Sequence, residues 1–174
     1  MLTSKKLSIG RIGIITEGGL ITRLLLPNET IAAPTPSPGS LEEHAFVQIE
    51  EYLNGERRQF ELPLAPLQGS LLQREIMLRL CTIPYGHTAT YGSLGPARTV
   101  GSVCAANPLP IIRPCHRVIP AHNPPGNYRG GSELKLRLLR MEASSSRLRL
   151  SNILALHDTD ILQQATALPG SDSL

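Results

Sequence analysis

A cysteine stands directly before a histidine in the stretch RPCHRVIP, which runs from Arg113 to Pro120. A free thiol is mostly protonated at neutral pH, and a neighbouring imidazole is a common device for making the nucleophilic thiolate. Adjacent side chains of an extended strand point to opposite faces, so His116 can reach Cys115 only if the backbone turns here or a water links the two groups. Pro114 favours such a turn. The stretch predicts a cysteine nucleophile with a histidine base, although a buried cysteine beside a surface histidine would give the same dipeptide.

An imidazole that acts as a base needs a group that orients it, commonly a carboxylate. The surrounding segment offers three candidates, Glu75, Glu133 and Glu142. The two other cysteines, Cys81 and Cys104, have apolar or small neighbours and are predicted to be buried as small hydrophobic side chains. An odd number of cysteines without CxxC spacing argues against a disulfide framework and against a zinc site.

The chain has 174 residues, of which 41% are hydrophobic and 3% aromatic, with no tryptophan. This length suits one sizeable domain or two small ones, and the core must be built mainly from Leu, Ile, Val and Ala. No segment reaches the roughly eighteen apolar residues of a membrane-spanning helix, and the N-terminus lacks the pattern of a secretory signal. We therefore expect a cytoplasmic protein.

Positive charge is concentrated in the middle of the chain. Residues 1–69 have a net charge of −2, residues 70–142 carry nine Lys or Arg against three Asp or Glu, and residues 143–174 have a net charge of −1. The resulting +6 of the middle segment, almost all of it arginine, suits a surface that binds nucleic-acid phosphates. Basic residues that only keep a surface solvated are the alternative.

The N-terminal part is predicted to be rich in β-structure. Two β-branched runs between residues 9 and 27 meet at a Gly-Gly pair, which predicts a hairpin. Three alternating prolines in residues 34–38 forbid a helix and predict an extended linker. Ser40 and Glu43 then form a capping box for a helix that ends at Gly55, with apolar residues at four-residue spacing.

A second part starts with another capping box, formed by Ser70 and Gln73, and the helix that it opens is ended by Pro84. A short helix is predicted over residues 97–106. Its small side chains would allow a close approach either to a DNA groove or to the interior of the protein, so both interpretations remain open. A further helix is predicted over residues 132–143.

The motifs NPLPIIRPCHRVIP, GNYRGG and RLLRMEA closely resemble the active-site region of the O6-alkylguanine-DNA alkyltransferases, also called methylated-DNA–protein-cysteine methyltransferases. The resemblance continues upstream, where GRIGIITEGGLITRLLLP looks like the family's N-terminal hairpin, and covers residues 8–142. It implies an α+β fold. A small β-rich, ribonuclease H-like domain with the Pro-rich linker would occupy residues 1–68, a helical DNA-binding domain of winged-helix type residues 69–143, and an extension residues 144–174.

The resemblance also implies a function, the repair of DNA by irreversible, stoichiometric transfer of an alkyl group. Cys115 would take the alkyl group from O6 of guanine and keep it as a thioether. His116 would draw off the thiol proton through a water, and Glu142 would orient His116. Asn107 would brace the turn that holds the thiol, and Tyr91 would donate a proton or hydrogen bond to the departing purine. A soft nucleophile combined with such a donor suits this chemistry.

A base inside a duplex is out of reach, so it must be flipped out, and the resemblance assigns Arg98 to the space behind the flipped nucleotide. The residues expected to contact DNA are Arg98, Thr99, Arg113 and Lys135. The residues expected to hold the base are Val118, Tyr128 and Arg129. The expected partner is double-stranded DNA containing O6-alkylguanine, bound by a monomer and without a membrane. The chemistry requires no cofactor and no metal, and the N-terminal part shows no convincing zinc-ligand cluster, although some relatives bind zinc there.

The chain departs from the family pattern between Tyr91 and Arg98, where only the six residues GSLGPA stand in the place of a longer helix-turn-helix. A helix of two turns needs about seven residues and the turn about three more. Either the first helix is reduced to a single turn or the match of Tyr91 is displaced. The shortened motif leaves open a lesion binder without transfer activity. A third class, a Cys-His hydrolase, would need an oxyanion hole that the sequence does not reveal.

Overall fold

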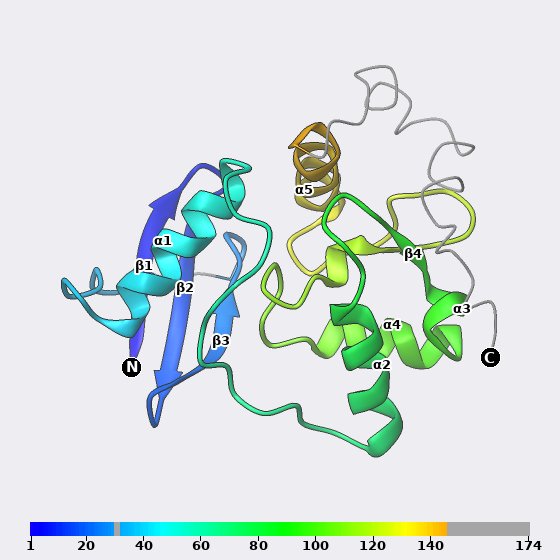
Figure 1. The fold of residues 1–174 in the computed structure, drawn as a ribbon, viewed down its shortest axis with the longest axis horizontal. Coiled ribbons are helices and arrows are strands. Elements are labelled where there is room, and N and C mark those ends of the chain that lie inside the picture. The colour runs from blue at the N-terminus through cyan, green and yellow to red at the C-terminus, as the bar shows by residue number, and fades with distance from the viewer. Residues whose placement is uncertain (30–31, 146–174) are drawn as a thin grey trace, which may run out of the picture.

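The structure is a computed structural model that describes residues 1–29 and 32–145. It has an α+β fold, as predicted. Figure 1 shows a small N-terminal sheet covered by one helix, beside a larger group of helices that forms the C-terminal part.

The N-terminal sheet has three antiparallel strands in the order of the chain, β1 (Leu2–Leu7), β2 (Gly10–Glu17) and β3 (Leu20–Leu25). The predicted hairpin is confirmed as the connection from β2 to β3. Gly18 and Gly19 form its turn with φ of +57° and +76°, a backbone conformation that other residues rarely adopt. The first strand, β1, was not predicted.

The proline-containing residues 32–39 form neither helix nor strand, in agreement with the predicted linker. Helix α1 (Leu41–Leu53) follows, and the hydroxyl of Ser40 accepts a hydrogen bond from the backbone N–H of Glu43 at 3.2 Å. The Glu43 carboxylate accepts from Gly39 N–H and not from Ser40, so only half of the expected capping box forms. The buried hydrophobic residues of α1 are Ala45, Phe46, Ile49 and Tyr52.

The described C-terminal part contains the helices α2 (Leu71–Cys81), α3 (Tyr91–Leu94), α4 (Ala97–Ala106) and α5 (Ser132–Ser145). Two short strands, β4 (Ala89–Thr90) and β5 (Val118–Ile119), pair in parallel. The capping box of Ser70 and Gln73 is complete, with both reciprocal hydrogen bonds formed. Helix α2 therefore has a well-defined start.

The sequence left two possibilities, a first helix reduced to one turn or a displaced Tyr91, and the length of helix α3 distinguishes them. The helix is a single turn of four residues, and Gly95 with φ of +155° and Pro96 connect it to α4. The turn of α3 contacts both α2 and α4. The first helix of the motif is thus reduced but still packed in place.

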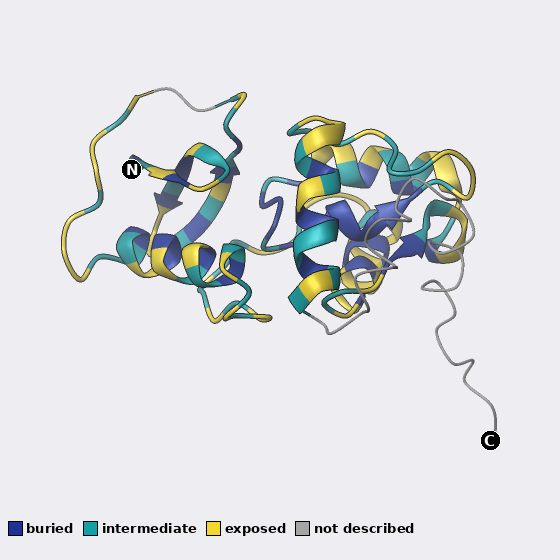
Figure 2. Cartoon of the chain, turned by 90° about the horizontal axis from the view of Figure 1, so that it is seen from above, coloured by how far each residue is buried: buried dark blue, intermediate teal, exposed yellow. Residues whose placement is uncertain are grey.

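Among the described residues, two large hydrophobic cores and a small cluster of Ile119 and Leu139 hold the molecule together. One combines the sheet and α1 with three residues of the C-terminal part, Leu109, Ile111 and Leu138. The second lies among α2, α3 and α4 and includes Cys115 and Val118. In Figure 2 the exposed residues lie on the outer faces of the helices and the buried residues on the faces turned inward. Because the first core crosses from the N-terminal to the C-terminal part, the two parts pack against each other.

Candidate active site

Cys115 lies in a tight turn of the backbone. Residues Cys115–Arg117 form a single 3-10 turn, η1, directly after Pro114 and before β5. The backbone N–H of Cys115 donates to the carbonyl of Arg113 at 2.8 Å, and the side chain of Cys115 is 4% exposed. The chain therefore does turn at the Cys-His pair, as the proline predicted, and the two side chains need not point to opposite faces.

Asn107 holds this turn from beneath. Its Nδ2 donates to the carbonyl oxygen of Arg113 at 2.8 Å and lies 3.1 Å from Sγ of Cys115, and its Oδ1 accepts from Leu109 N–H at 3.1 Å. The side chain is 1% exposed, so water does not compete for these bonds. Asn107 thus lies where the sequence predicted, and it also contacts the sulfur directly.

His116 points away from solvent toward α5. Its Nε2 lies 2.8 Å from Oε1 of Glu142 and 3.2 Å from the hydroxyl of Tyr52. The other ring nitrogen, Nδ1, is buried and has no hydrogen-bond partner among the described residues. A buried imidazole nitrogen without a partner is unusual and suits a site that a water or a reacting group occupies.

Glu142 is the centre of a dense network. Its carboxylate accepts two hydrogen bonds from Nε of Arg117 and one from Nη2, at 2.9 to 3.1 Å, and a further bond from Gly86 N–H at 3.0 Å. Among the three carboxylates weighed from the sequence, Glu142 is therefore the one that contacts His116.

Burial and these contacts set the protonation states. Burial raises the pKa of the Cys115 thiol, although Asn107, Lys135 and Arg129 oppose this. Burial likewise lowers the pKa of His116 below 6.5, so its imidazole is neutral at pH 7. Burial alone would raise the pKa of Glu142, but His116 and Arg117 outweigh it and hold that pKa well below its usual range. At neutral pH, the resting site is a thiol beside a neutral imidazole and an ionised carboxylate.

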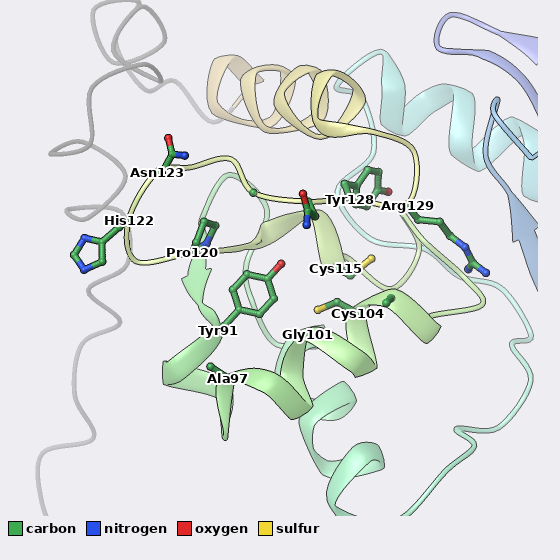
Figure 3. Close-up of a pocket in the computed structure, with 13 residues that line it drawn as sticks. Tyr91, Ala97, Gly101, Cys104, Cys115, Pro120, His122, Asn123, Tyr128 and Arg129 are labelled. Carbon is green, nitrogen blue, oxygen red and sulfur yellow. The ribbon is translucent and has the colours of Figure 1, made fainter.

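A cavity of about 690 Å³ opens above Cys115. Its lining includes Tyr91 from α3, Ala97 and Gly101 from α4, and Tyr128 and Arg129 from the loop that leads to α5 (Figure 3). The face of α4 that borders the cavity has small residues at every fourth position, Ala97, Gly101 and Ala105. Because residues four apart lie on one face of a helix, no large side chain of α4 fills the space there. The cavity has the size and apolar lining of a site for a small planar group.

Tyr91 lines the same cavity as Cys115, so the shortened motif does not displace it from the site. Burial raises the pKa of its hydroxyl, with the nearby thiols Cys104 and Cys115 adding to the effect. The hydroxyl is therefore protonated at neutral pH and able to donate a hydrogen bond into the cavity.

Lys135 is not placed to contact DNA, contrary to the prediction. It is fully buried, its Nζ donates to the carbonyl oxygens of Val118 at 2.7 Å and Asn127 at 3.2 Å, and it lies 5.9 Å from the ring centroid of Tyr91. Burial lowers its pKa to about 8. The physical reason is that long basic side chains can be buried when their donors find backbone acceptors. Lys135 supports the cavity wall.

Arg113 is also wrongly assigned to DNA contact. Its side chain is buried, and Nη2 donates to the carbonyl oxygen of Ala65 at 2.6 Å, so it fastens the linker to the active-site segment. Together with Arg117, this means that three of the nine basic residues in 70–142 are buried. The surface available to phosphates is less basic than the net charge of the segment suggests.

The remaining predicted residues are divided between the surface and the cavity. Arg98 is exposed and Thr99 half-buried, both in the first turn of α4. Tyr128 and Arg129 line the cavity, whereas Val118 is fully buried in β5 and does not. Arg129 is held by ion pairing with Glu29 at 2.9 Å and by donation to the Asn107 carbonyl at 2.6 Å.

The site residues that were not predicted from the sequence include Tyr52, Arg117 and Cys104. Arg117 stands inside the CHR triplet, so its position next to His116 was a signal that could have suggested a partner for a carboxylate. Cys104 lines the cavity and was predicted only as a small core residue. Tyr52 belongs to a distant helix with no local pattern that marks it.

Within residues 1–29 and 32–145, no group of three or more His, Cys, Asp or Glu side chains is arranged to hold a metal ion. No helix in this described range is both long and apolar enough to span a membrane.

Two family models match the chain. Residues 3–66 match the 6-O-methylguanine DNA methyltransferase ribonuclease-like domain, and residues 71–144 match the DNA binding domain of the same family. A methylated-DNA–protein-cysteine methyltransferase of Mycobacterium bovis is 36% identical over 147 residues, which cover 78% of this chain and 88% of the relative. An inducible enzyme of the same name from Bacillus subtilis is 41% identical over 113 residues, covering 61% of this chain and 62% of the relative.

The fold is also similar to solved structures. The crystal structure of Mycobacterium tuberculosis OGT in complex with DNA superposes with a TM-score of 0.72 at 34% identity, covering 90% of this chain and 99% of the other. The likeness therefore extends over both parts of the molecule and not only over the active-site motif.

Proposed function

Because the chain belongs to the 6-O-methylguanine DNA methyltransferase family, we propose that it repairs DNA by moving an alkyl group, such as methyl, from O6 of guanine to Sγ of Cys115. One observation carries this proposal. Cys115 lines a cavity of about 690 Å³ and contacts Asn107, while its neighbour His116 keeps one buried ring nitrogen that no described residue hydrogen-bonds.

The transfer begins when a water bridges the Cys115 thiol and Nδ1 of His116 and passes the thiol proton to the imidazole. The resulting imidazolium is stabilised by Glu142, which already lies 2.8 Å from Nε2. Sγ then attacks the alkyl carbon, so that a C–S bond forms as the C–O bond to guanine breaks. The purine leaves with a negative charge, and the hydroxyl of Tyr91 donates to it. His116 then releases its proton to solvent, and the guanine anion takes up a proton from solvent. The net charge is therefore unchanged by the reaction.

The product is a thioether, and nothing in this chemistry restores the thiol. Each molecule therefore acts once. A hydrolase would need donors aimed at an oxyanion beside Cys115, whereas the side-chain amide of Asn107 already hydrogen-bonds the sulfur and the Arg113 carbonyl.

Access of the base requires flipping out of the duplex. The small face of α4 suits a close approach to DNA, and the exposed Arg98 at the start of that helix would fill the space that the base leaves. Thr99 would contact the adjacent backbone. In the cavity, backbone groups of Tyr128 and Arg129 would hold the guanine.

The proposal includes the organisation of the chain. It comprises a β-rich domain of residues 1–68, an alkyltransferase domain of residues 69–143 and an extension of residues 144–174, nearly all of which lies outside the described residues. We place the protein in the cytoplasm, where it binds duplex DNA as a monomer.

A titration tests the function. Duplex DNA carrying O6-[methyl-³H]guanine is added in increasing amounts to a fixed amount of protein, and label bound to protein is counted. Alkyl transfer predicts a plateau at one methyl group per molecule. Binding of the duplex without covalent label would instead support a lesion binder, and release of product beyond one equivalent would support a hydrolytic enzyme.

A further inference from the structure

A tyrosine from the N-terminal part reaches the centre of the active-site network. Tyr52 lies in the last turns of α1 and is fully buried. Its hydroxyl donates to Oε1 of Glu142 at 2.5 Å and lies 3.2 Å from Nε2 of His116. The three residues are far apart in the sequence, so this contact exists only because the two parts of the molecule pack together.

The direction of these bonds fixes where the proton of His116 sits. The Tyr52 hydroxyl gives its hydrogen to the carboxylate, so its lone pairs remain as acceptors for a hydrogen on Nε2. The Glu142 carboxylate is an acceptor as well. With two acceptors facing Nε2, the neutral imidazole carries its hydrogen there, and Nδ1 has a free lone pair.

The hydroxyl is not needed to hold the ring. The Tyr52 ring packs against Phe60 with centroids 5.4 Å apart and edge-on against Tyr85 at 5.8 Å, and a phenylalanine would keep both contacts. Burying a hydroxyl at this position costs free energy unless its bonds are made. The polar atom therefore serves the network around His116 and not the packing of α1.

We propose that Tyr52 is a positioning residue for alkyl transfer: its hydroxyl holds His116 in the form protonated on Nε2, which leaves Nδ1 as the base that receives the Cys115 proton. This inference rests on the proposed function of Cys115 and His116. The N-terminal domain would then contribute to the reaction through the Tyr52 hydroxyl, which α1 places beside His116.

Other charged groups near His116 bear on the same equilibrium. The titratable side chains that face it are Tyr52 from α1, Cys115 and Arg117 from η1, Tyr128 from the loop after β5, and Lys135 and Glu142 from α5. Among the residues that the structure describes, Tyr52 and Glu142 are the two that contact Nε2. Removing the Tyr52 hydroxyl thus changes the acceptors of Nε2 without adding or removing a charge.

Tyr52→Phe is the test variant and Tyr85→Phe the matched control, because Tyr85 packs in the same ring cluster without a hydrogen bond to His116 or Glu142. Alkylation of Cys115 by iodoacetamide is followed from pH 6 to 10 by mass analysis of its peptide. Cys81, which is exposed and not buried as the sequence predicted, serves as internal reference. Below the thiol pKa, alkylation depends on transfer of the Cys115 proton to Nδ1, and Tyr52→Phe leaves fewer molecules with Nδ1 free to receive it. The reaction at pH 7 should therefore be roughly tenfold slower and recover at high pH, where solvent takes the proton. The pH midpoint of alkylation should rise by about one unit.

The control should keep the wild-type midpoint. An unchanged midpoint in Tyr52→Phe, or a loss of the same size at every pH, would overturn the proposal, because a purely structural role predicts one of these. If Tyr52→Phe does not fold, ¹⁵N–¹H correlation spectra of the wild-type protein show which ring nitrogen of His116 carries the proton. A proton on Nε2 supports the proposal, and a proton on Nδ1 refutes it. Neither readout uses DNA, so the labelled-methyl titration tests the proposed function separately.

Discussion

The side-chain amide of Asn107 lies 3.1 Å from the sulfur of Cys115 and 2.8 Å from the carbonyl oxygen of Arg113. One residue thereby fixes the turn that presents the thiol and contacts the thiol itself. An N–H directed at sulfur favours the thiolate over the neutral thiol, which opposes the effect of burial on the pKa of Cys115.

Replacement of Asn107 by Ala should therefore raise the pKa of Cys115, because burial would act without this opposing bond. We expect transfer at pH 7 to fall about tenfold or more, and the free energy of unfolding to fall by about 1–3 kcal/mol as the Arg113 carbonyl loses its partner. Single-turnover kinetics across pH and urea unfolding measure the two effects. Normal transfer at pH 7 in a folded variant would show that the amide only braces the turn.

Gly101 offers a way to block the cavity without disturbing the fold. It lies within α4 with an ordinary helical backbone, and a Cβ there would meet no atom within 4 Å. Gly101→Ala should keep transfer and stabilise the helix by about 0.5–1 kcal/mol. Gly101→Leu should fold equally well but lose most transfer, because its side chain enters the cavity beside Cys115. Single-turnover transfer and thermal unfolding distinguish the pair; full activity in Gly101→Leu would mean that the base binds elsewhere.

Arg98 is the exposed cation at the start of α4. If it fills the space of a flipped nucleotide, Arg98→Ala should slow transfer from duplex DNA about tenfold or more while leaving reaction with free O6-methylguanine base unchanged. Lys6→Ala, which removes an exposed cation on β1, serves as control. Equal losses on both substrates would argue against this role.

The acid sensitivity of the protein should depend on Glu142 and His116. The folded-state pKa of each is lowered, so the folded protein binds fewer protons than the unfolded chain. Their contribution to stability is present at neutral pH and is lost as the pH falls, first below 6.5 for His116 and then below 4.5 for Glu142. Urea unfolding from pH 8 to 3 measures this loss.

Glu142→Gln tests the contribution of the carboxylate charge to stability. The variant leaves buried Arg117 without its counter-charge. It should cost about 3–5 kcal/mol at pH 7 and weaken the pH dependence below 4.5. Glu50→Gln, in an exposed pair with Lys5, should change little. A Glu142→Gln variant as stable as the wild type would contradict the network described here.

Elements with strong local signals could be predicted from the sequence. The hairpin of β2 and β3 and the starts of α1 and α2 follow from a Gly-Gly pair and from helix-capping serines. Strand β1 could not be predicted, because its polar centre, TSKK, lacks the apolar residues typical of a strand. Its pairing with β2 holds it extended.

The site shows the same division. Cys115, His116 and Asn107 stand in one continuous motif and lie together in the structure. Tyr52 could not be found because its position depends on how α1 packs against the C-terminal part. Lys135 and Arg113 were misassigned because net charge does not reveal burial, and both satisfy their donors on backbone carbonyls.

The most direct test of the central claim is the intact mass of the protein after incubation with a duplex containing O6-methylguanine, followed by mapping of the modified peptide. Transfer to Cys115 predicts a gain of about 14 Da, one methyl group in place of a proton, confined to the peptide that carries Cys115 and absent from Cys115→Ala. An unchanged mass in folded protein that still binds the duplex, or a methyl group on another residue, would contradict it.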